Sequence, residues 1–332
     1  MAEADREQMN VADDLALELI RILRHENAPL VPEPTHQRFF DNVTSPVKAL
    51  LFDIYGTLFI SASGDIAVHS SGWPHGEAPD GIETEGPIAA ALHSAGCEIL
   101  DSAATEEVGR AEYLAAIEAA HEGKRRLAIE HPEVDILRVW AAIFEELNGT
   151  GLIRCVDDPR APYLAAITYE CRTNPVWPMP GAENLLQLLA ADEFEVGLIS
   201  NAQFYTPLLF PALLNRSLQE LGIDDCLCSW SFRRGIAKPS IKLFETVRDV
   251  LSRNYAIAPE EALYVGNDML NDMLPAQEVG FTTCLFAGDA RSLRLREGDP
   301  RCSHVRPDAM VGALEELPRI LKIRSSAGKE QK

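Results

Sequence analysis

Short apolar runs that end abruptly in polar residues recur along the chain. The first is Ala49–Phe52, which Asp53 follows directly. Three later runs have the same form, at 196–199, 262–265 and 282–287. Uninterrupted apolar runs of this length are typical of strands that are buried on both faces of a parallel sheet. The pattern therefore predicts four such strands.

Helical spacing of apolar residues separates these predicted strands. Leucines recur at helical intervals over 185–189, and a second apolar stripe covers 243–251. Alternating strands and helices predict an α/β fold with a doubly wound parallel sheet. Open sheets of this kind place ligands beyond the carboxyl ends of their strands, where this chain has polar residues.

The stretch between the first two predicted strands has a different character. Residues 61–83 are rich in Gly, Ser, Pro and His, which predicts a mobile loop. Residues 86–173 carry helical stripes only, clearest at 136–147, so an all-helical unit is predicted to interrupt the α/β domain. A further amphipathic helix is predicted over 11–23. The predicted division is 1–46 as an N-terminal helical leader, 47–62 and 176–325 as the α/β core, 63–175 as the loop plus a helical cap, and 326–332 as a tail.

The charge of the chain argues against some classes of partner. Its 332 residues carry 30 Lys and Arg against 51 Asp and Glu, a formal net charge of −21. Such a surface repels phosphate backbones and anionic membranes, so neither nucleic acid nor a membrane is an expected partner. A small anionic substrate must therefore meet a local positive site. A homodimer contact through the N-terminal helix stays open, with nothing in the sequence that supports it.

The sequence predicts neither a targeting segment nor a membrane-spanning segment. The N-terminus lacks a basic stretch followed by an apolar core, so no signal peptide is predicted, and no apolar run reaches the length of a membrane span. The seven cysteines show no zinc-site spacing and are interpreted as reduced thiols. The expected localisation is cytoplasmic.

Four polar segments lie beside the predicted strands and helices. Asp53-Ile54-Tyr55-Gly56-Thr57 follows the first strand, Ser200-Asn201 ends the second, Lys238-Pro239 precedes a helix, and Asp268 and Asp272 follow the third strand. Taken alone, Asp53 also fits a capping residue before a turn glycine. The other three segments favour a functional site, because the carboxyl ends of parallel strands meet at one edge of the sheet.

Together these segments resemble the four motifs of the haloacid dehalogenase (HAD) superfamily of hydrolases, from residue 48 to about residue 290. The family's first motif, D-x-D/Y-G-T-L, is matched from Asp53. The second is an apolar strand that ends in Ser or Thr, matched at Ser200, and the third is a Lys usually followed by Pro, matched at Lys238. The fourth is an apolar strand followed by an acidic pair, matched by Asp268 and Asp272. The intervals suit a cap inserted after the first strand.

The resemblance implies a catalytic role for several matched residues. Asp53 would be the nucleophile that forms a covalent intermediate, which water then hydrolyses. The Ser200 hydroxyl and the backbone N–H of Asn201 would hold oxygens of the transferring group, and Thr57 would contact the substrate. Lys238 would neutralise the charge that develops between Asp53 and the substrate.

The same resemblance implies a metal ion. Mg²⁺, a hard cation that prefers oxygen ligands, would be held by the carboxylates of Asp53, Asp268 and Asp272 and by the backbone carbonyl of Tyr55. Tyr55 also belongs to the implied catalytic set, but it departs from the pattern of the family's phosphatases. These have a second Asp there, which protonates the leaving alkoxide and later activates water. A tyrosine, with an ordinary pKa of about 10, is a poor substitute for that acid and base.

Other residues divide between the pattern of the family's dehalogenases and that of its phosphatases. The family's dehalogenases carry Tyr at the position of Tyr55, and a halide leaves without a proton, which favours carbon–halogen chemistry. Those dehalogenases are metal-free and have a Ser- and Asn-rich fourth motif, whereas this one is acidic, although the usual Gly-Asp is here Gly266-Asn267. They also commonly place a tyrosine six residues after the third-motif lysine, where this chain has Phe244.

These observations lead to one prediction and three alternatives. The leading prediction is a Mg²⁺-dependent phosphatase of a small phosphorylated metabolite, acting through an aspartyl-phosphate at Asp53. The alternatives are a 2-haloacid dehalogenase-like hydrolase, a phosphonate hydrolase that cleaves a carbon–phosphorus bond, and a catalytically weak HAD-fold binding protein.

Overall fold

The chain folds into two compact units. The computed structural model describes residues 2–63 and 85–323, with side chains from residue 14 onward. One unit, here the helical unit, comprises Met1–Pro29, Ile66–Val176 and Ala202–Asn215. The other, the sheet unit, comprises Leu30–Asp65, Trp177–Asn201 and Arg216–Lys332. Most of the predicted loop at 61–83 lies outside the described residues.

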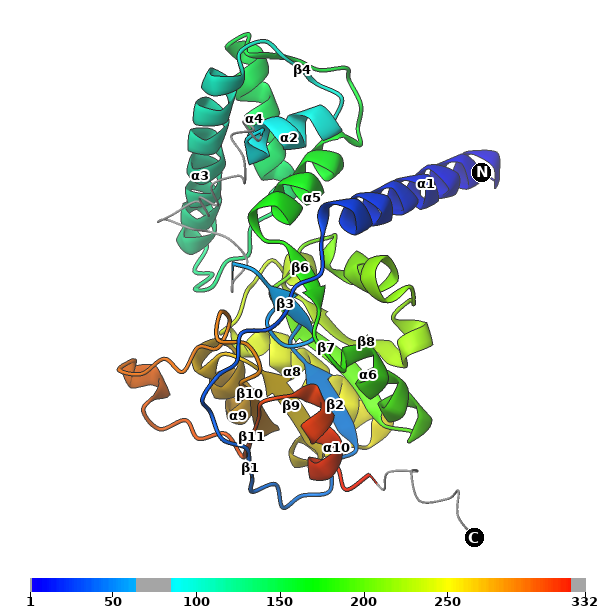
Figure 1. The fold of residues 1–332 in the computed structure, drawn as a ribbon, viewed down its shortest axis with the longest axis vertical. Helices are drawn as coiled ribbons and strands as arrows, with labels where there is room; N and C mark the ends of the chain where they lie inside the picture. Colours follow the sequence, from blue (N-terminus) through cyan, green and yellow to red (C-terminus); the bar gives the residue numbers. More distant parts are fainter. Residues whose placement is uncertain (1, 64–84, 324–332) are drawn as a thin grey trace. The chain divides into compact units, whose positions relative to one another are not determined.

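A seven-stranded sheet forms the centre of the sheet unit (Figure 1). Its strand order is β1-β11-β10-β9-β2-β7-β8, and neighbouring strands are parallel except for β1 with β11. The predicted α/β fold with a doubly wound, mostly parallel sheet is confirmed. The strands are β1 (Phe40–Asp41), β2 (Ala49–Phe52), β7 (Glu195–Ser200), β8 (Ile223–Trp230), β9 (Ala262–Gly266), β10 (Thr282–Phe286) and β11 (Ala309–Val311).

Strand β2 lies between β7 and β9 and is buried along its whole length. Phe52, its last residue, pairs with Leu198 of β7 and with Val265 of β9. The three strands therefore end close together at one edge of the sheet, and the residues that follow them meet there. This register is what assembles the candidate site.

Helices of the sheet unit pack their apolar stripes onto the sheet. Phe244 and Leu243 of α8 are fully buried in one cluster with Leu51 of β2 and Tyr264 of β9. The helices are α6 (Ala182–Ala191), α7 (Ser231–Arg234), α8 (Ile241–Val250), α9 (Leu274–Glu278) and α10 (Leu317–Ile320), with short turns η3 (Gln219–Leu221), η4 (Leu251–Tyr255), η5 (Pro259–Glu261), η6 (Met269–Met273), η7 (Pro300–Cys302) and η8 (Leu314–Glu316). Strands β3 (Phe59–Ser61) and β6 (Val176–Pro178) form a separate two-stranded sheet.

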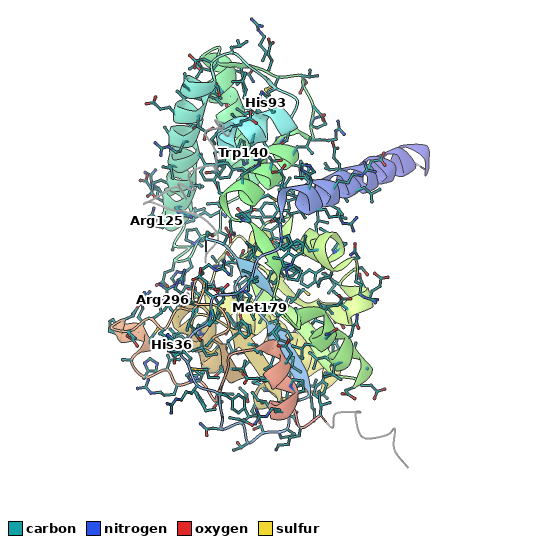
Figure 2. The ribbon with its side chains drawn as sticks, in the orientation of Figure 1. His36, His93, Arg125, Trp140, Met179 and Arg296 are labelled. Atoms are coloured by element: carbon teal, nitrogen blue, oxygen red, sulfur yellow. A yellow bond between two sulfur atoms is a disulfide. The ribbon has the colours of Figure 1, made fainter. Side chains whose placement is uncertain are left out.

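Aromatic side chains hold the helical unit together. Trp140, which Figure 2 labels among the helices, is fully buried, and its ring centroid lies 6.3 Å from that of Tyr113 and 5.5 Å from that of Tyr169. The predicted stripe at 136–147 is thus a core stripe. The elements are α1 (Ala2–Glu26), α2 (Pro87–Ser94), α3 (Ser102–Arg126), α4 (Ile136–Gly149) and α5 (Ala161–Thr173), with η1 (Thr206–Leu208), η2 (Phe210–Leu214) and a short pair of strands, β4 (Glu98–Ile99) and β5 (Ile153–Arg154), which the sequence did not predict.

The N-terminal helix belongs to the helical unit and is not a separate leader. Leu19 and Leu23 of α1 are buried. The Arg24 guanidinium donates hydrogen bonds to the carbonyls of Ala212 and Pro211, at 2.8 and 2.7 Å. These contacts join α1 to the 202–215 segment, which the predicted boundaries assigned to the α/β core.

Two cysteines of the helical unit form a disulfide, which corrects the expectation that the cysteines are reduced thiols. Cys97 and Cys155 are bonded across 58 residues of sequence. They flank the pairing of β4 with β5, so the two-stranded pair brings them together. The five others, at positions 171, 226, 228, 284 and 302, are free.

Within the described residues, none of the helices is both long enough and apolar enough to span a membrane.

Reducing this disulfide is expected to lower the stability of the helical unit. Closing a long loop typically contributes about 2–4 kcal/mol to the free energy of unfolding. Urea unfolding with and without reductant should show this loss, and the C97S/C155S double variant should show no further loss when reductant is added. Peptide mapping of non-reduced protein that lacks a Cys97–Cys155 linked pair would contradict the assignment.

Candidate active site

Asp53 opens a tight turn at the carboxyl end of β2. Its backbone N–H donates to the carbonyl of Val265 at 2.9 Å, which extends the pairing with β9 by one residue. Gly56 follows with a φ of 79°, a left-handed conformation that favours glycine. A Cβ on Gly56 would lie 2.5 Å from the side chains of Asn267 and Ser292, so the turn also packs too closely for any other residue.

Lys238 is the charged centre of the site. Its Nζ lies 2.7 Å from Asp53 Oδ1 and 2.6 Å from Asp272 Oδ1, and its side chain is 3% exposed. Asn201 orients it, because Asn201 Oδ1 accepts a hydrogen bond from the backbone N–H of Lys238 at 2.7 Å. Burial alone would lower the pKa of Lys238, but the carboxylates of Asp272 and Asp53 outweigh burial and raise the pKa above its ordinary value. The lysine is therefore a permanent cation between two carboxylates.

Asp272 faces donors on both carboxylate oxygens. Oδ1 accepts from Lys238 and from the Tyr264 hydroxyl, the latter at 2.8 Å, while Oδ2 accepts from the backbone N–H groups of Asn267 and Asp268 at 3.0 and 2.9 Å. Burial raises the pKa of Asp272, and the Lys238 ammonium opposes that rise. Four donors around two oxygens fit the ionised carboxylate, so Asp272 acts as the buried counter-ion of Lys238.

Tyr264 is a member of the site that the sequence analysis missed. Its hydroxyl lies 3.0 Å from Lys238 Nζ and 3.1 Å from the carbonyl oxygen of Ile199. Burial, together with the Asp272 carboxylate, raises the pKa of Tyr264 well above 10, so it stays protonated. Its ring packs edge-on against Phe244, 5.0 Å between centroids. A tyrosine inside an otherwise apolar strand was the available signal.

Tyr264→Phe is expected to destabilise the sheet unit, because Asp272 loses one donor while it stays buried. A hydrogen bond to a charged group is worth about 1.5–3 kcal/mol. The remaining carboxylate holds its proton more readily, so the loss should be larger at pH 8 than at pH 5. Tyr255→Phe, which removes a part-buried hydrogen bond to Asp224, is the matched control. Equal losses for both variants at both pH values would contradict a special role for Tyr264.

Ser200, Thr57 and Tyr55 lie at the same edge of the sheet. The fully buried Ser200 hydroxyl donates to the carbonyl of Asn201 at 3.0 Å. The Thr57 hydroxyl lies 3.4 Å from Asn267 Oδ1. Tyr55 is buried and forms an isolated bridge with Phe59. Their roles toward a substrate stay predictions, since these contacts are within the protein.

Asp268 is placed differently from the other predicted site residues. Its carboxylate caps η6, accepting from the backbone N–H of Leu270 at 2.8 Å and of Asn271 at 3.3 Å. The Arg296 guanidinium also binds it through two nitrogens, at 3.0 and 2.5 Å. Figure 2 labels Arg296, which comes from the loop after β10. Asn267 instead places its side-chain oxygen 3.4 Å from the hydroxyl of Thr57, in the turn that Asp53 opens.

The predicted Mg²⁺ ligands do not fit a metal in this arrangement. Both oxygens of Asp272 are occupied by four donors, and those of Asp268 by Arg296 and backbone N–H groups. Across residues 14–63 and 85–323, no three His, Cys, Asp or Glu side chains group as a metal site requires. Asp53 alone of the three carboxylates keeps an oxygen without a donor among the hydrogen bonds described above. To bind Asp268 or Asp272 as well as Asp53, a metal would have to displace Arg296 or Lys238.

The strand register brings the buried lysine and the aspartate after β2 together, and sequence comparison identifies the class of protein. The family model described as a haloacid dehalogenase-like hydrolase matches residues 47–280. The match spans well over half of the chain, which therefore belongs to this family. Comparison with curated proteins returned no match.

Solved structures of dehalogenases and of a phosphatase from this family resemble the chain. The 2-haloacid dehalogenase from Pseudomonas syringae pv. Tomato DC3000 is 19% identical with a TM-score of 0.47, and the comparison covers 83% of this chain and 98% of that one. The L-2-haloacid dehalogenase from Xanthobacter autotrophicus is 20% identical with a TM-score of 0.42, covering 84% and 100%. A HAD phosphatase from Thermococcus onnurineus is 18% identical with a TM-score of 0.44, covering 83% and 98%. These likenesses do not choose between the two activities.

Proposed function

We propose that this chain hydrolyses a small anionic substrate through a covalent intermediate on Asp53, by the 2-haloacid dehalogenase type of reaction. The observation that carries the proposal is Lys238 Nζ, 2.7 Å from Asp53 Oδ1 in a buried setting. The ammonium holds an Asp53 oxygen in a fixed position inside a buried setting, which orients a nucleophilic aspartate for attack.

The leaving group in this reaction needs no proton. An Asp53 oxygen bonds to the carbon that bears the halogen, the carbon–halogen bond breaks, and halide departs with the electron pair. Water then attacks the ester carbonyl, which releases a hydroxy acid and one proton and restores the carboxylate. Tyr55 stands where an acid would be required for an alkoxide leaving group, so this sequence of steps suits the residues present.

The Mg²⁺-dependent phosphatase is the second candidate. The acidic residues beyond β9, Asp268 and Asp272, favour it because carboxylates are the ligands that Mg²⁺ prefers. It requires the Arg296 guanidinium to leave Asp268, and a phosphate ester would still lack an acid at position 55. These two requirements place it behind the dehalogenase type of reaction.

One assay separates the candidates. Purified protein is incubated with panels of 2-haloacids, phosphate esters and phosphonates, with Mg²⁺ or with EDTA, and halide and phosphate are measured. Halide release that survives EDTA is the expected result. Phosphate release that EDTA abolishes would replace the proposal with the phosphatase, and phosphate release from phosphonates alone would indicate carbon–phosphorus cleavage. A folded protein that is silent on every panel would favour a binding role.

A further inference from the structure

The loop after β10 reaches back to the candidate site. We call residues 289–296 the strap. It runs beside the segment after β9, because the backbone N–H of Arg294 donates to the carbonyl of Asn267 and the N–H of Met269 donates to the carbonyl of Arg294, each at 2.9 Å. The Ser292 side chain lies against Gly56, in the turn that Asp53 opens. The strap is therefore built into the site.

The strap contacts the side chains of two consecutive residues after β9, Asn267 and the predicted metal ligand Asp268. The Asn267 amide Nδ2 donates to the carbonyl oxygen of Ser292 at 2.7 Å, in a buried setting. The Arg296 guanidinium holds both oxygens of Asp268. Arg296 has a φ of 52°, an unfavourable conformation for a residue with a Cβ, so its place is fixed by these contacts.

We propose that the strap is the device that keeps a divalent metal out of this acidic site. The Ser292 carbonyl selects an amide at position 267, because a carboxylate there would set two acceptors 2.7 Å apart with no proton between them. Arg296 meanwhile occupies Asp268 with a resident cation. The inference concerns the same site as the proposed function and extends it, since it names the residues that make the chemistry metal-independent.

The net charge of the site predicts how strongly it attracts a divalent cation. Three carboxylates, Asp53, Asp268 and Asp272, face two cations, Lys238 and Arg296, so the group carries 2 − 3 = −1. Replacing Arg296 by Gln makes it −2, and adding Asn267→Asp makes it −3 and supplies a further oxygen ligand beside the turn that Asp53 opens. Each step should strengthen the attraction for a divalent cation.

The test measures binding of Mn²⁺ without substrate, by the loss of the free-ion signal in electron paramagnetic resonance. Wild type should bind Mn²⁺ only with Kd above about 1 mM, R296Q about tenfold more tightly, and N267D/R296Q about tenfold more tightly again. R301Q is the matched control, because Arg301 forms the same paired contact with the surface residue Asp299 and its loss changes the net charge equally.

Two outcomes would overturn the proposal. One is wild-type protein that binds Mn²⁺ with Kd below about 0.1 mM, because that affinity would require the Asp268 carboxylate, which Arg296 of the strap occupies. The other is R296Q and N267D/R296Q binding no more tightly than R301Q. If N267D/R296Q fails to unfold cooperatively, the comparison of R296Q with R301Q decides alone. The Mn²⁺ measurement contains no substrate, so a negative result there does not contradict the proposed activity. Likewise, an absence of halide release from haloacids does not contradict the proposal for the strap.

Discussion

Replacing Asp53 with Asn is expected to abolish turnover of whichever substrate the protein hydrolyses. An amide oxygen is a far weaker nucleophile than a carboxylate oxygen, and losing a covalent nucleophile typically lowers kcat by about 10⁴-fold or more. The fold should persist, because Asn is nearly the same shape, its Oδ1 can still accept from Lys238 Nζ, and Asp272 remains as counter-ion.

The measurement is kcat in the halide and phosphate assay, together with intact-protein mass spectrometry after rapid quenching. Wild type should show a substrate adduct that maps to Asp53, and D53N should show none. Asp299→Asn serves as the control for the same chemical change at a surface ion pair, and should retain full activity. Turnover by D53N at a rate near wild type would remove Asp53 as the nucleophile.

Replacing Lys238 with Met is expected to be the most destabilising single change in the sheet unit. Asp53 and Asp272 would then face each other without their shared ammonium, and removing one partner from a buried ion pair costs about 3–5 kcal/mol. Activity should be lost as well, since Asp53, the proposed nucleophile, loses its only described charged partner.

The pH dependence of this loss has a definite sign. Without the ammonium, the already raised pKa of Asp272 rises further, so the folded protein binds a proton that the unfolded chain releases near pH 4. Stability of K238M should therefore fall as pH rises, and the gap from wild type should be widest near pH 8 and narrowest near pH 5. Lys242→Met, on an exposed position of α8, is the control. Urea midpoints for K238M and K242M that agree at pH 8 would contradict the buried ion pair.

Much of the sheet and the centre of the site could be predicted from sequence. The apolar runs located β2, β7, β9 and β10 to within a residue or two, because strands buried on both faces leave uninterrupted apolar segments. Parallel strands end at a common edge, so Asp53 and Asp272 were expected near each other, and the resemblance to the HAD motifs placed Lys238 with them. The structure brings both carboxylates within hydrogen-bond distance of Lys238 Nζ.

Other parts of the site could not be predicted, because they depend on contacts without a sequence pattern. Arg296 lies 28 residues from Asp268, in a loop with no regular spacing, so nothing in the sequence pairs them. The spacing of Asp268 and Asp272 was compatible with two metal ligands. The side-chain directions do not suit a shared metal, since Asp268 caps η6 and Asp272 turns toward Lys238. The Cys97–Cys155 pairing depends on two strands of two residues each, below what a periodicity can reveal.

The strap itself is anchored by a stretch of chain that precedes the family match. Glu33 accepts from the backbone N–H of Ala290 and donates its own N–H to Asp289, while Arg291 donates to the carbonyl of Val31 at 2.6 Å. Thr35 donates to the carbonyl of Ala287 at 2.6 Å. A protein trimmed to begin at residue 47 would keep all four motifs and lose these anchors along with β1. We therefore expect a protein that begins at residue 47 to hold the strap less firmly than the whole chain does, and to bind divalent metal more readily as a result.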